Sequence, residues 1–162
     1  MSSRDQVITW LNDAYAMEQA LEETLERHAK DAQGENEEVH ERIQRHIQET
    51  RDQAATVREC IESLGGQVSG SKSAFASMFG AMQGNLNKPA GDTMVKNAVA
   101  DYAAEHFEIA TYRALIDAAR QIGEEEVSGK LTGILRQEEE MARFLEQQLP
   151  GAVRETVGAA AS

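Results

Sequence analysis

The chain has 162 residues and carries 28 acidic against 16 basic side chains, which gives a formal net charge of -12. This length fits one domain with one core. The acidic excess argues against nucleic-acid binding and against attachment to an anionic membrane, because both need clustered Lys and Arg. The single cysteine, Cys60, excludes an intramolecular disulfide and a cysteine-based metal cage. The sequence shows no signal-peptide pattern and no apolar run of the ~20 residues that a membrane span needs, so we expect a cytoplasmic protein.

Four long segments, roughly 4–31, 36–63, 92–121 and 125–149, are predicted to be helices. They are rich in Ala, Leu, Glu, Gln and Arg, which favour helix formation. Their apolar residues recur every three or four positions, as in helices that bury one face. The breaks between them fall at Gly34, Gly65, Gly66, Gly91 and Gly123, and the first glycine after the second segment suits a left-handed helix cap. Pro150 is predicted to end the fourth helix.

The connections predict an antiparallel four-helix bundle over residues 1–150, with a flexible tail over 151–162. The short breaks near Gly34 and Gly123 make two helical hairpins. The connection between the hairpins has about 27 residues, which is enough to run back along helices of about 42 Å and set the second and third helices parallel. Apolar residues at helical spacing in this connection predict a short crossover helix, the alternative being an extended loop; they are Phe75, Met78, Phe79, Met82 and Leu86.

Carboxylates interrupt the apolar stripe in the middle of each predicted helix. Glu18, Glu49, Glu105 and Glu138 stand where the helical repeat places inward-facing residues, and Glu108 follows Glu105 by one turn. The acids of each hairpin are equally far from its turn, so all four helices can place a carboxylate at one level of the bundle. The alternative is that the stripes are rotated and some of these acids face solvent or neighbouring Arg.

Such a layer needs positive charge, because buried carboxylates are costly unless they are paired or bound to metal. No Lys or Arg occupies the same inward positions. Two metal ions would balance the layer, and hard oxygen ligands favour iron or manganese. His46 lies on the same face, either as a hydrogen-bonded core residue or as a ligand, and Asp52 is either a ligand or a surface acid. Tyr15 and Tyr112 flank the layer and are expected to pack and hydrogen-bond beside it.

The other three histidines are expected outside the site. His28 and His40 lie near the hairpin end and are expected at the surface, and His106 is expected beside the layer.

Three stretches resemble the YciE/YciF-like family of bacterial stress-associated proteins within the ferritin-like di-iron superfamily. They are residues 13–19 (DAYAMEQ), 46–50 (HIQET) and 105–112 (EHFEIATY). The Gly65-Gly66 turn and the Glu138-Glu139 pair add weaker support. The resemblance covers most of residues 5–149.

This resemblance implies a dimeric, dimetal-carboxylate bundle linked to stress, with iron as the expected metal and manganese or zinc as alternatives. The resemblance carries no assigned reaction. Our hypothesis for a di-iron site is Fe(II) oxidation or the reduction of O₂ or peroxide, which leaves ferroxidase-like or peroxidase-like activity open. The sequence departs from the wider ferritin-like pattern, since neither Glu49 nor Glu138 begins a Glu-x-x-His motif. His46 precedes Glu49 by three residues and could supply a nitrogen in reversed order. The alternative function is a structural or interaction bundle with a degenerate metal site and no catalysis.

Overall fold

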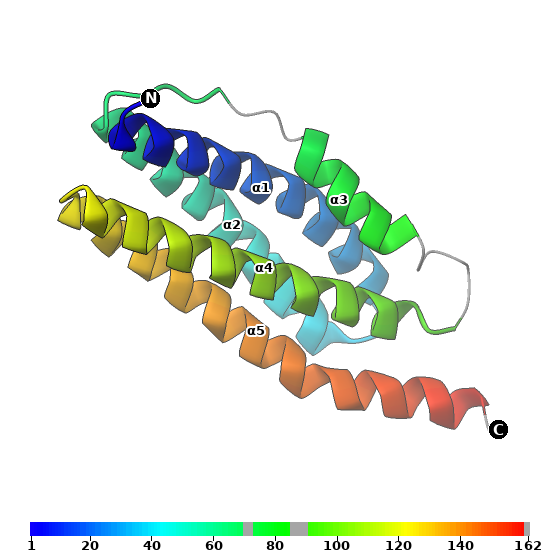
Figure 1. Cartoon of the computed structure of the whole chain (residues 1–162). Coiled ribbons are helices and arrows are strands. Elements are labelled where there is room, and N and C mark those ends of the chain that lie inside the picture. The colour runs from blue at the N-terminus through cyan, green and yellow to red at the C-terminus, as the bar shows by residue number, and fades with distance from the viewer. Residues whose placement is uncertain (70–72, 85–90, 161–162) are drawn as a thin grey trace.

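The computed structural model of the chain describes residues 1–69, 73–84 and 91–160, and this part is helical throughout apart from turns and connections (Figure 1). Four long helices form the bundle, and a short fifth helix lies beside it. In chain order they are α1 (Ser3–Ala32), α2 (Glu37–Ser63), α3 (Ser73–Gly84), α4 (Thr93–Gln121) and α5 (Glu125–Ala160). The predicted all-α fold with a crossover is therefore confirmed.

Side-chain caps and glycine turns set the ends of these helices. The Ser2 hydroxyl accepts a hydrogen bond from the backbone N–H of Asp5, whose carboxylate accepts one from the backbone N–H of Ser2, and this capping box starts α1. Beyond α2, Gly65 adopts a φ of 84°, and the N–H of Gly66 donates to the carbonyl of Ile61 at 3.0 Å. This is the left-handed cap that the sequence predicts, because glycine adopts positive φ without steric cost.

The bundle is built from two antiparallel hairpins, α1–α2 and α4–α5, that pack through α1 against α4 and α2 against α5. Figure 1 shows α2 and α4 running in the same direction, and within the described residues these two helices do not contact each other. The long connection therefore joins parallel helices, as predicted, but these helices lie diagonally across the bundle.

The predicted crossover helix is confirmed as α3, which packs on α1 and α4. Phe79 is 3% exposed, and its ring meets the Phe107 ring of α4 edge-on. Before α3, the Asn12 side chain holds the connection to α1, donating to the carbonyl of Gln67 and accepting from the N–H of Ser69. Two predicted crossover residues are not covered, since the side chain of Met82 and all of Leu86 lie outside the described part.

Pro150 does not end the fourth helix, so that prediction is wrong. The helix continues through Pro150 to Ala160, and Figure 1 shows it bending in the region of the proline. Proline removes one backbone donor and crowds the preceding turn, which bends a helix without having to end it. The residues that follow include Ala, Val, Arg and Glu, all compatible with further helical turns.

Two apolar clusters fill the bundle, one on each side of its middle. The larger includes Leu11, Val57 and Leu131, and the smaller includes Ile43 and Leu145. Residues between these positions on each helix therefore lie where the two clusters meet.

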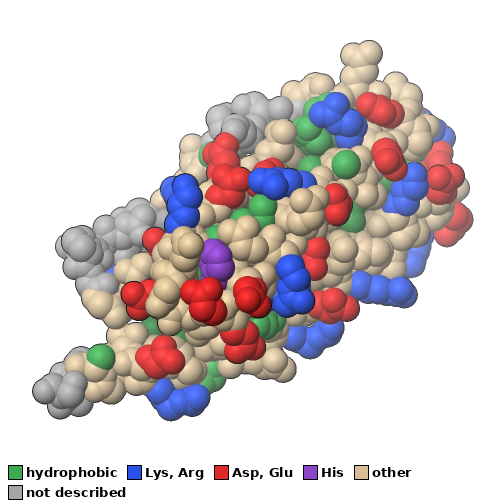
Figure 2. All heavy atoms as spheres, turned by 180° about the vertical axis from the view of Figure 1, so that it is seen from behind, with side chains coloured by type: hydrophobic (Ala, Val, Ile, Leu, Met, Phe, Trp, Pro, Cys, Tyr) green, Lys and Arg blue, Asp and Glu red, His purple; other side chains and the backbone are tan. Residues whose placement is uncertain are grey.

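The surface mixes both signs of charge. Figure 2 shows Lys and Arg side chains dispersed among Asp and Glu on the face that it presents. No helix within the described ranges has the length and apolarity needed to cross a membrane.

Candidate metal centre

All four bundle helices contribute to one buried polar layer between the two apolar clusters. Glu18 comes from α1, His46 from α2, Glu105 and Glu108 from α4, and Glu138 from α5. Each of the five side chains is at most 2% exposed. The helical repeat and the distances from the two turns thus bring four of the five predicted carboxylates into one place.

His46 lies at the centre of the contacts in this layer. Its Nε2 atom lies 2.8 Å from Oε1 of Glu105 and 3.7 Å from Oε2 of Glu138, and its Nδ1 atom lies 2.7 Å from Oε2 of Glu49. One donor atom each from His46, Glu105, Glu108 and Glu138 lies within 4.8 Å of the others. These four side chains could hold a metal ion, with His46 supplying nitrogen and the others oxygen.

Tyr112 closes one side of the layer. Its hydroxyl donates a short hydrogen bond to Oε1 of Glu18, and its side chain is fully buried. Tyr112 therefore packs and hydrogen-bonds beside the layer, as the sequence predicts. The hydroxyl of Tyr15 instead accepts a hydrogen bond from Arg58 at 2.7 Å, and the Arg58 guanidinium lies over the Tyr15 ring.

Burial dominates the ionisation of three of the carboxyls. It raises the pKa of Glu18 to about 8, although the hydrogen bond from Tyr112 and the charge of His46 act in the opposite direction. The pKa values of Glu108 and Glu138 lie well above the ordinary range because both side chains are buried and face other carboxylates.

Glu105 and His46 form the ionised pair of the layer. Burial alone would raise the pKa of Glu105, but the His46 charge and hydrogen bond hold it below the ordinary value. Burial alone would lower the pKa of His46, yet Glu105, Glu49 and Glu138 together raise it well above the ordinary value. A protonated His46 beside an ionised Glu105 is therefore the state favoured by these surroundings.

Several oxygens of this layer lack hydrogen-bond partners unless two carboxyls share a proton. Among the described residues, they are Glu18 Oε2, Glu105 Oε2, Glu108 Oε2 and both oxygens of Glu138. Buried polar atoms are normally paired, so a group of orphaned oxygens in one place needs an explanation. Either bound metal ions or protons shared between carboxyls would explain these unpaired oxygens.

Glu49 and Asp52 stand apart from the buried layer. The Glu49 side chain is 28% exposed and lies between His46 and the guanidinium of Arg42, which is 3.3 Å away. Asp52 is exposed, and its Oδ1 atom accepts a hydrogen bond from Gln48 at 3.0 Å. Glu49 can therefore reach a metal only from the edge of the layer, while Asp52 lies on the outer face of α2.

The other histidines lie outside this layer, but one of them is not where the sequence predicts it. His106 is exposed and stacks edge-on with Tyr102, as expected. His28 was expected at the surface and is instead 2% exposed, with Nδ1 2.6 Å from Oδ1 of the buried Asp101. His40 was also expected there, but it is half-buried and contacts the carbonyl of Ala29.

The His28–Asp101 pair was missed by the sequence analysis, although a signal existed. Asp101 lies four residues before Glu105 on α4, and His28 lies three after Leu25 on α1. Both positions continue the inward stripes of their helices. An inward-facing His and Asp at one end of a bundle can be paired by the same reasoning that brings the carboxylates together.

Fold and site together define a class: an α-helical bundle of two hairpins joined by a crossover, with a buried glutamate–histidine cluster that could hold a metal ion. A family model described as "Domain of unknown function (DUF892)" matches residues 2–158. The chain belongs to this family.

Solved structures support the same assignment. A protein from Xanthomonas campestris is 34% identical, with 99% of this chain and all of that chain covered and a TM-score of 0.86. The E. coli stress protein YciF is 22% identical over 95% of this chain and 98% of its own, with a TM-score of 0.84. YcfI from Rhodopseudomonas palustris is 23% identical over 90% and 94%, with a TM-score of 0.81. The YciF-like relationship predicted from the sequence is thus confirmed. The similarities to YciF and YcfI concern the fold alone.

Proposed function

We propose that the protein binds two metal ions in the buried layer, with iron as the physiological metal. His46, Glu105, Glu108 and Glu138 would provide the compact donor group. Glu18 does not belong to this group but interacts with Glu105 and Glu108, and it adds the carboxylate that a second cation requires. Glu49 would complete the set from the edge of the layer.

The observation that carries this proposal is the group of buried carboxylate oxygens without hydrogen-bond partners. Within the described residues, no Lys or Arg side chain forms a hydrogen bond with Glu18, Glu105, Glu108 or Glu138. Carboxylates without basic partners are costly in a low-dielectric interior, and divalent cations remove that cost. Oxygen donors with one imidazole suit iron or manganese, and zinc would also bind.

We further propose redox chemistry of Fe(II) with O₂ or peroxide as the activity of the loaded protein. The similar structure YciF is described as a stress protein, which supports a role in the bacterial stress response. Bound iron would supply the electrons. The chain's own residues would hold the ions, keep bulk water from the layer and, through Tyr112, orient Glu18.

Elemental analysis of anaerobically purified protein tests the proposal directly. We expect about two iron or manganese ions per chain in the unaltered protein, and near-zero content in the double variant Glu18→Gln plus Glu105→Gln. The matched control changes two exposed acids on the same helices, Asp13→Asn and Asp117→Asn. Equal metal content in the double variant and the control would refute the assignment.

A second candidate function is a metal-free structural bundle. The observation in its favour is that His46 bridges Glu105 and Glu49, which leaves the layer partly neutralised without any ion. This candidate predicts a melting temperature that does not change with added Mn(II), whereas a ligand that binds only the folded protein raises it. An increase that disappears in the Glu18→Gln plus Glu105→Gln variant would exclude it.

The expected homodimer stays a prediction. Light scattering during size-exclusion chromatography measures the molar mass and would separate a dimer from a monomer and from a storage cage.

A further inference from the structure

The buried layer needs a route by which ions reach it. Glu18, Glu105 and Glu138 are at most 2% exposed. Glu49 reaches the surface next to them, but the Arg42 guanidinium beside its carboxylate repels an approaching cation. A favourable route for a cation therefore lies elsewhere, where carboxylates face a cavity that no Lys or Arg lines.

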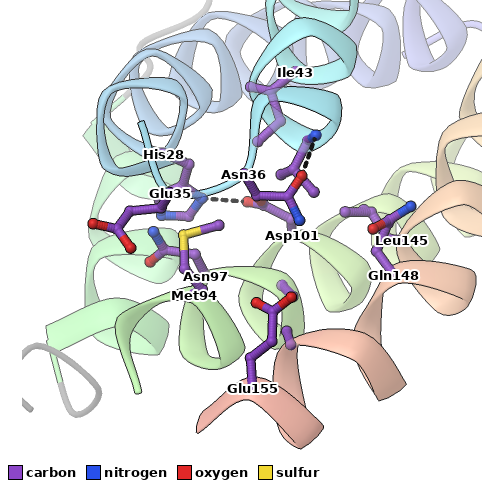
Figure 3. Close-up of a pocket in the computed structure, with 13 residues that line it drawn as sticks. His28, Glu35, Asn36, Ile43, Met94, Asn97, Asp101, Leu145, Gln148 and Glu155 are labelled. Atoms are coloured by element: carbon purple, nitrogen blue, oxygen red, sulfur yellow. Dashed lines mark hydrogen bonds and ion pairs between the residues drawn. The ribbon is translucent and has the colours of Figure 1, made fainter. Parts of the chain in front are cut away.

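A cavity of this kind lies at one end of the bundle. It encloses about 60 Å³ between the α1–α2 turn, the first half of α4 and the last part of α5 (Figure 3). Its described lining includes the carboxylates of Glu35, Asp101 and Glu155 and no Lys or Arg. Figure 3 shows the Glu155 side chain extending from α5 toward the cavity. The groove between α4 and α5 is different, because Arg113 and Arg143 line it.

Asp101 connects this cavity with the buried layer. It is 3% exposed and lies 2.6 Å from Nδ1 of His28 at the cavity wall. Since Asp101 precedes Glu105 by four residues, the two carboxyls lie one above the other on the inner face of α4. Burial raises the pKa of Asp101, His28 lowers it, and the carboxylate of Glu105 raises it again, so the two carboxyls interact electrostatically.

The outer wall of the cavity belongs to the end of α5 that follows Pro150. Ala152 and Glu155 line the cavity from this segment. Pro150 has no N–H to donate to the carbonyl of Glu146, and Val157 on the same segment is 63% exposed. A helical end with a missing hydrogen bond and exposed apolar residues separates from its neighbours at low cost.

From this arrangement we propose that the cavity is the entrance through which divalent cations reach the buried layer, with Asp101 as the transfer ligand. Glu35 and Glu155 attract the hydrated ion, and the ion exchanges waters for the carboxylate of Asp101. It then passes to Glu105 one helical turn further in. This inference rests on the proposed metal-binding function.

The kinetics of Co(II) uptake test the entrance separately from the binding site. Stopped-flow absorption gives the rate constant of loading, and equilibrium titration gives the number of ions bound. Glu35→Gln plus Glu155→Gln should slow loading about threefold or more at low ionic strength, with the final stoichiometry unchanged. The matched control, Asp117→Asn plus Glu140→Gln, removes two exposed charges from α4 and α5 away from the cavity and should load at the original rate.

Two further variants address the passage itself. Ala152→Phe should obstruct the cavity and slow loading at high as well as low salt, because the obstruction is steric. Asp101→Asn keeps the shape of the side chain but removes its charge. This variant should slow the transfer of the ion from the cavity to Glu105, at high as well as low salt.

If the entrance variants take up Co(II) as fast as the unaltered protein and the control, the proposed entrance is wrong, but the proposed metal centre is not affected. A reduced final stoichiometry at an unchanged rate would also overturn the entrance, because these residues would then be ligands instead of a route. No uptake by the unaltered protein would overturn the entrance and the proposed function together.

Discussion

The stability of the metal-free protein should fall as the pH rises from about 5 to about 8. The pKa of Glu18 is about 8 in the folded protein and 4.5 when unperturbed, so folding favours its protonated form. Its stabilising contribution is complete below pH 4.5 and is lost progressively up to about pH 8. At about 1.4 kcal/mol per pKa unit, Glu18 alone lowers the free energy of unfolding by about 3 kcal/mol between about pH 5 and pH 7.

The other ionisable groups of the layer also make the stability depend on pH, and the direction of each contribution follows from the direction of its pKa shift. Glu108 and Glu138 also have raised pKa values, so they destabilise the folded protein as the pH rises. His46 has a raised pKa too, and the stability it provides is lost as the pH rises through that value. The lowered pKa values of Glu105 and Glu49 act oppositely, because the stability they contribute is lost as the pH falls below about 4.5. Stability should therefore be greatest near pH 5.

Urea unfolding followed by circular dichroism in the presence of a chelator measures this dependence. Glu18→Gln cannot ionise, so this variant should lose less stability than the unaltered protein over the same range. Saturating Mn(II) should abolish the fall, because the bound ion favours ionised carboxylates. Metal-free protein whose stability stays constant or increases from pH 5 to pH 7 would refute the reasoning.

Three further predictions concern the free energy of unfolding of the metal-free protein, measured in urea. Tyr112→Phe should lower it by about 1–3 kcal/mol, since a buried oxygen of Glu18 loses its donor; an unchanged value would contradict the bond. Asp101→Ala should lower it by about 1–3 kcal/mol, because it removes the carboxylate that is hydrogen-bonded to the buried His28 ring; a loss below 1 kcal/mol would mean that the pair is not buried as described. Gly129→Ala should raise it by about 0.5–1 kcal/mol, since a Cβ at this helical position meets nothing within 4 Å; a decrease would indicate a contact there.

The inner carboxylates could be predicted from the sequence because helix geometry and turn position are both readable from it. Glu18, Glu105 and Glu138 each fall on the face that carries the apolar residues of their helix, and their distances from the turns fix their level. The glycines at the turns made those distances reliable, because positive φ at Gly34 and Gly123 marks where each hairpin reverses.

The edge of the layer could not be predicted in the same way. At the level of the layer, the buried positions of α2 include His46, Thr50 and Gln53. Glu49 lies about 60° from His46 around the helix, since each residue turns by about 100°. A rotation of this size decides whether a carboxylate points inward or toward Arg42. It depends on how α2 packs against α5, which the apolar pattern alone does not determine. His46, which the sequence left open as a core residue or a ligand, consequently lies within the layer, and Glu49 lies at its edge.

The charge balance of the layer connects its stability with its proposed function. Without metal, a protonated His46 offsets an ionised Glu105, while Glu18, Glu108 and Glu138 are favoured in their neutral forms. Two divalent cations would balance the four ionised carboxylates beside a neutral imidazole. Both states are neutral, so the folded interior can hold either protons or metal ions, and each replaces the other. Metal affinity should therefore rise over the same pH range in which the metal-free protein loses stability, because the protons that stabilise the empty layer are those that the ions must displace.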